Sequence, residues 1–259
     1  MSLDQGTGFV KRQTAPPDAF LGGRLVVAQP KNGFRAGFDS VLLGASVGRN
    51  ATSLLELGAG AGVPSLVALA HNDKLKATLI EFDASVHPLT TSNLKDNAFA
   101  DRGRVVTADL TQPADRTAAG LASDSFTAVI ANPPFFDSAA GTSPSPERSA
   151  ARHMPSDLLD SWVRAAATHA TPNGEVIFIH VPQSLPALLN AFAPRFGAVT
   201  ILPLAPRAGD AAIRVLVRGI KGSRAPLQLL ATRVLHDDTG RGFAPAFEAI
   251  FRGSAVLDW

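Results

Sequence analysis

A glycine-rich turn is the first part of the sequence whose residue types and spacing could bind a ligand. It lies within residues 54–64, LLELGAGAGVP, where an apolar, strand-like run leads through three alternating glycines into the start of a helix. Glycines let a backbone turn sharply and approach a ligand closely, and the first amides of a helix can donate hydrogen bonds to that ligand. A dinucleotide fingerprint, G-x-G-x-x-G/A, would end here on Val63 or Ser65, which weakens a nicotinamide interpretation.

Two acidic residues and one aromatic residue follow later strand-like runs. Glu81 and Phe82 end the run at residues 76–82, and Asp109 follows the run at residues 104–107. At the carboxyl end of a strand, the Glu81 carboxylate can accept hydrogen bonds from both hydroxyls of a ribose, and Phe82 can pack on an adenine. The alternative interpretation is a structural turn with two solvated carboxylates.

A second motif lies in residues 130–137, IANPPFFD. Two consecutive prolines stiffen the exit from a buried strand, and they restrict the preceding Asn132 to an extended conformation, which fixes the direction of its side chain. The motif therefore presents an amide and a nearby aromatic ring, Phe135, where a strand ends. A plain Pro-Pro turn that ends a strand is the alternative.

The glycine turn resembles the acidic-x-G-x-G-x-G motif of class I S-adenosylmethionine (SAM)-dependent methyltransferases, in which the turn lies under the amino-acid end of the cofactor. The resemblance implies that Glu56 orients that end and that Asp109 binds the adenine amino group. The cofactor-binding residues implied in this way are acids, glycines and one aromatic residue: Glu56, Gly58, Gly60, Gly62, Glu81, Phe82 and Asp109.

The proline motif resembles the (N/D)-P-P-(Y/F) signature of methyltransferases that act on nitrogen conjugated to a ring or a carbonyl. Such a nitrogen is a poor nucleophile because its lone pair is delocalised. The resemblance implies that the Asn132 amide oxygen and the Pro133 carbonyl accept its two hydrogens and aim the lone pair at the methyl group, while Phe135 stacks on the flat group. The implied catalytic set is Asn132, Pro133, Pro134 and Phe135.

Residues 29–45, QPKNGFRAGFDSVLLGA, resemble the segment that precedes the core in bacterial tRNA(Val) adenine N6-methyltransferases. That segment covers the cofactor in the family, which implies that Gly37 and Asp39 lie near SAM. The resemblance continues in residues 146–153, PERSAARH, close to the family's basic loop, and in residues 213–217, IRVLV. We assign substrate contacts to the arginines of these two segments: Arg148, Arg152 and Arg214.

The strands that must position these residues recur along the chain. Helix-compatible stretches separate them, as in right-handed βαβ units, and two later β-like runs suit an antiparallel pair. The runs are residues 52–57, 76–82, 104–107, 126–131, 175–180, 198–204 and 212–219. We predict an α/β, Rossmann-like class I methyltransferase fold with a seven-stranded, mostly parallel sheet and helices on both faces.

The chain is expected to form one catalytic domain with two flanks. Residues 1–50, with one helix at residues 40–48, would form a lid or flank over the cofactor site. Residues 51–220 would form the catalytic domain, and residues 221–259 would be a C-terminal extension packed on the same domain.

Composition excludes several kinds of chemistry. The chain has 259 residues and no cysteine, so disulfides, thiolate metal sites and cysteine nucleophiles are impossible, and no metal site is expected from its six histidines. The histidines at 71, 87, 169 and 180 are interpreted as structural. Tyrosine is absent, so stacking falls to phenylalanine. Without a long apolar run or a signal-like N-terminus, we expect a soluble, cytoplasmic protein that does not contact membranes.

Positive charges gather towards both ends of the sequence, although the formal net charge is only +2. We expect them to contact the phosphates of an RNA partner, with ordinary solvated faces as the alternative. They are Lys11, Arg12, Arg24, Lys31, Arg35, Arg195, Arg207, Arg214, Arg218, Lys221, Arg224 and Arg233.

The function expected is SAM-dependent methyl transfer to an exocyclic amino nitrogen of an RNA base, with adenine N6 in tRNA as the leading target. A protein glutamine N5-methyltransferase would share the proline motif but usually carries a dedicated N-terminal helical domain, and only about fifty residues precede the glycine strand here. An rRNA guanine N2-methyltransferase would share the motif as well. A SAM-binding, RNA-binding protein without turnover is the non-enzyme alternative. The oligomeric state is left open.

Overall fold

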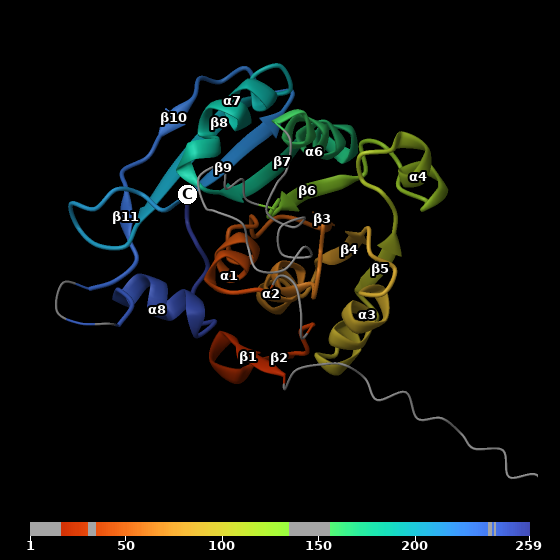
Figure 1. The fold of residues 1–259 in the computed structure, drawn as a ribbon, viewed down its shortest axis with the longest axis horizontal. Coiled ribbons are helices and arrows are strands. Elements are labelled where there is room, and N and C mark those ends of the chain that lie inside the picture. Colours follow the sequence, from red (N-terminus) through yellow and green to blue (C-terminus); the bar gives the residue numbers. More distant parts are fainter. Residues whose placement is uncertain (1–16, 31–34, 135–155, 238–239, 241) are drawn as a thin grey trace, which may run out of the picture.

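The computed structural model describes residues 17–30, 35–134, 156–237, 240 and 242–259. Its centre is a sheet of nine strands within this described part of the chain, in the order β10-β8-β9-β7-β6-β3-β4-β5, with β11 also paired to β8 (Figure 1). The strands are β3 (Ser53–Leu57), β4 (Lys76–Glu81), β5 (Gly103–Thr107), β6 (Phe126–Ala131), β7 (Ala170–His180), β8 (Phe196–Ala205), β9 (Arg214–Lys221), β10 (Gln228–Leu229) and β11 (Arg233–Val234).

The seven longer strands form the predicted, mostly parallel sheet. β3 lies between β4 and β6 with both pairings parallel, and β5 and β7 continue the parallel sheet on either side. β9 is antiparallel to β7 and to β8, which confirms the predicted antiparallel pair. Two further strands, β10 and β11, have two residues each and extend the sheet beyond β8. They were not predicted from the sequence.

The strand order reverses direction at β3, because the chain runs from β3 outwards to β5 and then returns to β6 on the other side of β3. In open α/β sheets, the carboxyl ends of the strands at such a reversal border the ligand-binding crevice. The glycine turn follows β3 and the proline motif follows β6, so both predicted motifs leave the sheet at this point.

Helices cover both faces of the sheet, as predicted (Figure 1). On one face lie α1 (Phe38–Ala45), α2 (Val63–His71) and α3 (His87–Asp96), whose apolar side chains share a core with Leu54 and Ile130. On the other lie α6 (Ser156–His169) and α7 (Leu185–Phe192), which pack on Leu55 and Val129. This alternation follows from the two-residue period of a strand. The short helices α4 (Pro113–Ala118) and η2 (Pro182–Ser184) complete the connections.

The N-terminal flank contains a small hairpin that the sequence did not predict. Strands β1 (Asp18–Phe20) and β2 (Leu25–Val27) pair antiparallel around a short 3-10 turn, η1 (Leu21–Gly23). Asn93 of α3 and Asn97, which directly follows α3, bind β2 and the residue after it as another strand would. The Asn97 side chain accepts from the Val26 N–H and donates to the Val26 carbonyl, both at 2.9 Å. Asn93 does the same at Ala28, also at 2.9 Å.

The C-terminal segment packs beside α1. Helix α8 (Pro245–Phe251) contacts α1, and beyond it the Leu257 N–H donates to the Ala45 carbonyl at 2.9 Å. Helix α1 is the helix expected at residues 40–48, but it begins at Phe38 and ends at Ala45. None of the helices in the described ranges has the length and apolar character that a membrane span requires.

Candidate active site

The glycine turn after β3 has a backbone that other residues would adopt only with strain. Gly58, Gly60 and Gly62 have φ values of 66°, 52° and 81°. A Cβ atom at Gly58 would lie 2.5 Å from the Trp162 ring, and one at Gly62 would lie 2.8 Å from Leu79. A Cβ built on Gly60, in contrast, meets no heavy atom of the described residues within 4 Å. The turn is therefore packed from below at two glycines and open to a ligand at the middle one.

Side chains from β4 and α3 hold this turn in place. Glu81 accepts a hydrogen bond from the Gly60 N–H at 2.8 Å, and the Thr90 hydroxyl donates to the Gly60 carbonyl at 2.5 Å. The buried Asn93 amide donates to the Ala61 carbonyl at 2.9 Å. Sequence reasoning identified Glu81 but missed Thr90 and Asn93, because no local pattern marks a residue that contacts a turn some thirty positions away.

Glu56 lies beneath the turn and is only 3% exposed. Its carboxylate accepts a hydrogen bond from the Ser65 N–H at 3.0 Å, near the start of α2. Burial raises the pKa of Glu56 to about 8, although the hydrogen bond from Ser65 opposes that rise. Ser65 Oγ is buried and has no hydrogen-bond partner among the described residues. A carboxyl group in this state will ionise readily when a cation is placed beside it.

The residues predicted to hold a nucleoside lie together at the ends of β4 and β5. Glu81 and Asp109 are close in space because the Ala108 N–H donates to the Glu81 carbonyl at 3.0 Å. Phe82 is 72% exposed, so its ring is accessible for stacking. One oxygen of Asp109 accepts hydrogen bonds from the Thr111 N–H at 2.8 Å and hydroxyl at 2.6 Å, which orients the carboxylate.

The proline motif leaves the sheet beside the glycine turn. Leu57 of β3 and Ala131 of β6 are paired in the sheet, so Gly58 and Asn132 are the next residues of two neighbouring strands. Asn132 Oδ1 is buried and has no hydrogen-bond partner among the described residues. An acceptor left in this state costs about 1–3 kcal/mol, so the site is complementary to a ligand that brings an N–H donor. Pro133 is buried beside it.

Asp39 and Arg214, predicted for the cofactor and the substrate respectively, bind each other. Arg214 Nε lies 2.8 Å from Asp39 Oδ2, and the arginine also lies over the Phe38 ring, 5.6 Å from its centroid. Burial raises the pKa of Asp39, while the hydrogen bond and the charge of Arg214 oppose the rise. Asp39 Oδ1 is buried without a hydrogen-bond partner among the described residues. Gly37 directly precedes α1 and caps its N-terminus.

Three of the predicted site residues, Phe135, Arg148 and Arg152, lie outside the described residues. The others divide into two groups. The cofactor set from Glu56 to Asp109 and the Asn132 motif lie at the carboxyl ends of β3, β4, β5 and β6. Asp39 and Arg214 lie where α1 and β9 begin, and because β9 is antiparallel to β7, Arg214 lies at the same edge of the sheet. Within the described ranges, no group of three or more His, Asp or Glu side chains could hold a metal ion.

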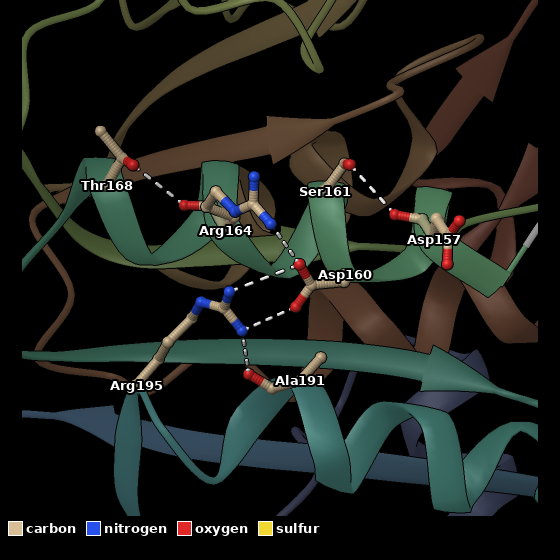
Figure 2. Close-up of polar contacts among 7 residues, drawn as sticks. All are labelled: Asp157, Asp160, Ser161, Arg164, Thr168, Ala191 and Arg195. Carbon is tan, nitrogen blue, oxygen red and sulfur yellow. Dashed lines mark hydrogen bonds and ion pairs between the residues drawn. The ribbon is translucent and has the colours of Figure 1, made fainter.

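Several of the basic residues expected on an RNA-binding surface have partners within the fold. Figure 2 shows Asp160 on α6 between Arg164 of the same helix, at 2.6 Å, and Arg195, at 2.8 Å. Arg195 also donates to the Ala191 carbonyl near the end of α7 at 2.6 Å. This arginine therefore joins α6 to the segment after α7.

Other cations of the expected set have similar partners. Lys221 forms an ion pair with Asp124 at 2.5 Å and donates to carbonyls in the last turn of α6 and at the first residue of β7. Arg218 lies 4.4 Å from the ring centroid of Trp259, and Arg24 donates to the Gly253 carbonyl at 2.6 Å. Contacts of these residues with phosphates stay a prediction, and the structure shows only that each side chain has an intramolecular partner.

Known proteins resemble this chain in sequence and in structure. Residues 39–201 match the sequence model of the methyltransferase small domain family. The tRNA1(Val) (adenine(37)-N6)-methyltransferase of Shewanella amazonensis is 34% identical over 137 residues, which cover 52% of this chain and 56% of that protein. The protein of the same name from Porphyromonas gingivalis is 27% identical over 169 residues, covering 63% and 65%. The matched parts are thus less than two thirds of these relatives' lengths.

A solved structure shares the fold over nearly its whole length. It is described as a predicted O-methyltransferase from Agrobacterium tumefaciens, is 32% identical, and superposes with a TM-score of 0.72 over 85% of this chain and 98% of that one. The class I methyltransferase fold predicted from the sequence is confirmed by this likeness and by the strand order.

Proposed function

Since the chain belongs to the methyltransferase small domain family, we propose that it transfers the methyl group of SAM to an exocyclic amino nitrogen of an RNA base, adenine N6 in tRNA. The names of the curated relatives support tRNA(Val) as the first RNA to test. A tRNA substrate would place the reaction in the cytoplasm.

The observation that carries the proposal is the buried Asn132 oxygen, which has no donor in the part of the chain that the structure describes and lies beside an open glycine turn. An exocyclic amine has two hydrogens, and Asn132 Oδ1 can accept one of them while the Pro133 carbonyl accepts the other. Both bonds would turn the nitrogen lone pair away from the ring and towards the cofactor side of the crevice. Catalysis would then depend on orientation and on fixed dipoles rather than on a covalent intermediate.

The residues around the turn are suited to SAM. When bound, SAM would supply an electrophilic methyl group on its sulfonium. Gly60 leaves space for the amino-acid end, and the Glu56 carboxyl beneath the turn can balance its ammonium charge. Glu81 and Asp109 offer oxygen acceptors to the ribose and the adenine amino group, and Phe82 offers its exposed ring.

The first prediction concerns Asn132→Ala. We expect the rate of labelled methyl transfer to a tRNA(Val) transcript to fall by about a hundredfold or more, because one of two acceptors that orient the nitrogen is lost. The dissociation constant for SAM, measured by calorimetry, should change by no more than about twofold. Asn190→Ala, at an exposed position of α7, serves as the control and should leave both quantities unchanged. Methyl transfer by Asn132→Ala at the wild-type rate would contradict the chemical assignment.

Mass spectrometry of nucleosides from the methylated tRNA distinguishes the remaining targets. N6-methyladenosine is the product expected. N2-methylguanosine would move the target to guanine, and a ribose 2′-O-methyl group would fit the name of the Agrobacterium relative instead. Methyl transfer to a protein glutamine but not to RNA would overturn the proposed substrate class.

A further inference from the structure

Arg116, in the short helix α4, is a buried cation that the proposed chemistry does not use. Its side chain belongs to a residue that is only 7% exposed, and its Nη1 donates to the Leu110 carbonyl at 2.5 Å. Leu110 directly follows Asp109, the acid expected to bind the adenine amino group of SAM. The guanidinium therefore binds the backbone of the segment that carries this acid.

The same guanidinium binds a buried histidine on another element. Arg116 Nε donates to His169 Nε2 at 3.1 Å, and His169, the last residue of α6, is 2% exposed. On the other side of the ring, Nδ1 lies 2.9 Å from the Ala122 carbonyl. A carbonyl can only accept, so Nδ1 carries the proton and Nε2 is the acceptor for the arginine. Arg116 thus links the Asp109 segment to the end of α6.

The surroundings suit a charged arginine beside a neutral imidazole. Burial lowers the pKa of Arg116, and the negative charge of Asp109 opposes that fall. Burial and the charges of Arg116 and Lys221 lower the pKa of His169, against its bond to Ala122, so the ring is neutral at pH 7. Breaking either bond of the guanidinium would leave part of a buried cation unsatisfied, which is costly. The two bonds therefore hold the arginine in one position.

The Asp109 segment needs such a contact on its far side. On the near side, the Ala108 N–H donates to the Glu81 carbonyl at 3.0 Å and fixes the segment to the sheet. After Asp109, the bonds of the carboxylate to Thr111 are local. Local bonds preserve the shape of a turn but do not fix it relative to other elements. The bond from Arg116, anchored on α6, does so.

We propose that Arg116 and His169 are positioning residues for cofactor recognition: together they hold the segment after β5 so that the Asp109 carboxylate meets the amino group of adenine. The inference rests on the part of the proposed function that assigns SAM as the cofactor and Asp109 to its adenine. It does not depend on which RNA is methylated.

Two ligands measure this recognition without any turnover. One is S-adenosylhomocysteine, and the other is its analogue with a hydrogen in place of the 6-amino group of adenine. The ratio of their dissociation constants, measured by calorimetry without RNA, is the preference for the amino group. In the wild-type protein we expect a preference of about tenfold or more, because a hydrogen bond to a charged acceptor contributes that much.

Substitutions in the buried pair should reduce this preference. In Arg116→Met, which loses the donors, we expect it to fall to about threefold or less, while the affinity for the amino-free analogue changes by no more than about twofold. His169→Leu, which removes the acceptor of the arginine, should act in the same way. His169→Gln offers an amide oxygen to Arg116 and should recover the preference to within about twofold of wild type.

A matched control is Arg102→Met. Arg102 is also half-buried or less exposed than a surface cation, and it donates to the loop carbonyls of Asn72 and Leu75 at 2.9 Å and 3.3 Å. It directly precedes β5, however, at the opposite edge of the sheet from Asp109. We expect this variant to lower the free energy of unfolding while the preference for the amino group stays within about twofold of wild type.

A double-mutant cycle tests whether the pair acts through Asp109. Asp109→Ala should remove most of the preference, and adding Arg116→Met should then change it by no more than about twofold. A further loss in the double variant would overturn the proposal, as would a preference in Arg116→Met equal to that of wild type or an equal loss of affinity for both ligands. If Arg116→Met does not fold, the two His169 variants decide the same question.

The wild-type protein separates this inference from the proposed function. Wild-type protein that binds neither ligand would refute the assignment of SAM, and with it the inference. Wild-type protein that binds both ligands equally would refute the role of Asp109 in adenine binding, and so the role of the pair. Wild-type preference that survives in Arg116→Met and in His169→Leu would refute the positioning role alone.

Discussion

The carboxyl group of Glu56 has opposite preferences with and without a bound cation. In the protein alone, burial raises its pKa to about 8, so the carboxyl is largely protonated at neutral pH. An ammonium group of SAM beside it would favour the ionised form, so binding would release a proton below pH 8. The affinity for SAM should therefore increase as the pH rises towards 8.

Calorimetric titrations between pH 6 and pH 7.5 test this prediction. We expect the wild-type affinity for SAM to increase by up to about tenfold per pH unit, since each unit below the pKa corresponds to about 1.4 kcal/mol. Glu56→Gln cannot ionise, so its affinity should be weaker at pH 7.5 and almost independent of pH in this range. A pH slope that persists in Glu56→Gln would show that another group takes up the proton.

Sequence reasoning identified the residues of the site that local spacing marks, and missed those brought in by packing. Glu56, Glu81 and Asn132 stand at the ends of apolar runs, where a strand's period ends and a turn begins. Thr90 and Asn93 lie within α3, and the turn carbonyls that they bind are recognisable only once α3 is packed against the glycine turn. The pairing of Arg214 with Asp39 likewise joins positions 175 apart in sequence.

The contact between α3 and β2 links the N-terminal flank to the glycine turn. Asn93 is 1% exposed and makes three hydrogen bonds, two with Ala28 of the flank and one with the Ala61 carbonyl of the turn. Asn97, one helical turn later, binds Val26 of β2 but not the glycine turn. The two asparagines therefore share the flank contact, and only Asn93 reaches the cofactor side.

Alanine substitutions at these two positions should have different consequences. Asn93→Ala should lower the free energy of unfolding by about 2–3 kcal/mol, because buried partners lose their hydrogen bonds, and it should weaken SAM binding as well. Asn97→Ala should cost about 1 kcal/mol and leave SAM affinity unchanged. Urea denaturation and calorimetry measure both effects. If Asn93→Ala and Asn97→Ala changed SAM affinity equally, the shared contact with the N-terminal flank would explain both effects. The direct bond from Asn93 to the glycine turn would then have no separate role in SAM binding.

The boundaries of an element were predictable where burial produces a clear run or alternation of apolar residues. They were not predictable where the element is short or irregular. β3 and β6 lie within one residue of their predicted ranges, because both are buried central strands. β7 begins five residues earlier than predicted, since it contains an irregularity with Asn173 at φ 63° that breaks the alternation. The hairpin of β1 and β2 has strands of three residues, too few to show a period.

At the scale of the whole molecule, the C-terminal segment joins parts that lie far apart in sequence. The indole N–H of Trp259 donates to the Ser46 carbonyl after α1 at 2.9 Å, and its ring lies against Arg218 of β9. The expected C-terminal extension thus contacts the end of α1 opposite to Asp39. We propose that it stabilises the fold and takes no part in the chemistry.

Trp259→Ala tests whether the C-terminal extension stabilises the fold without taking part in the chemistry. Removing a half-buried indole with its hydrogen bond and its cation–π contact should lower the free energy of unfolding by about 2 kcal/mol. The rate of methyl transfer should stay within about twofold at temperatures where the variant is folded, as it should in the control Asp258→Ala at the exposed neighbouring position.

In Trp259→Ala, Trp162 is the only tryptophan left, and because its ring packs against Gly58, SAM binding should change its fluorescence. A SAM titration that leaves the fluorescence of Trp259→Ala unchanged, while calorimetry shows binding, would mean that the cofactor does not reach the glycine turn.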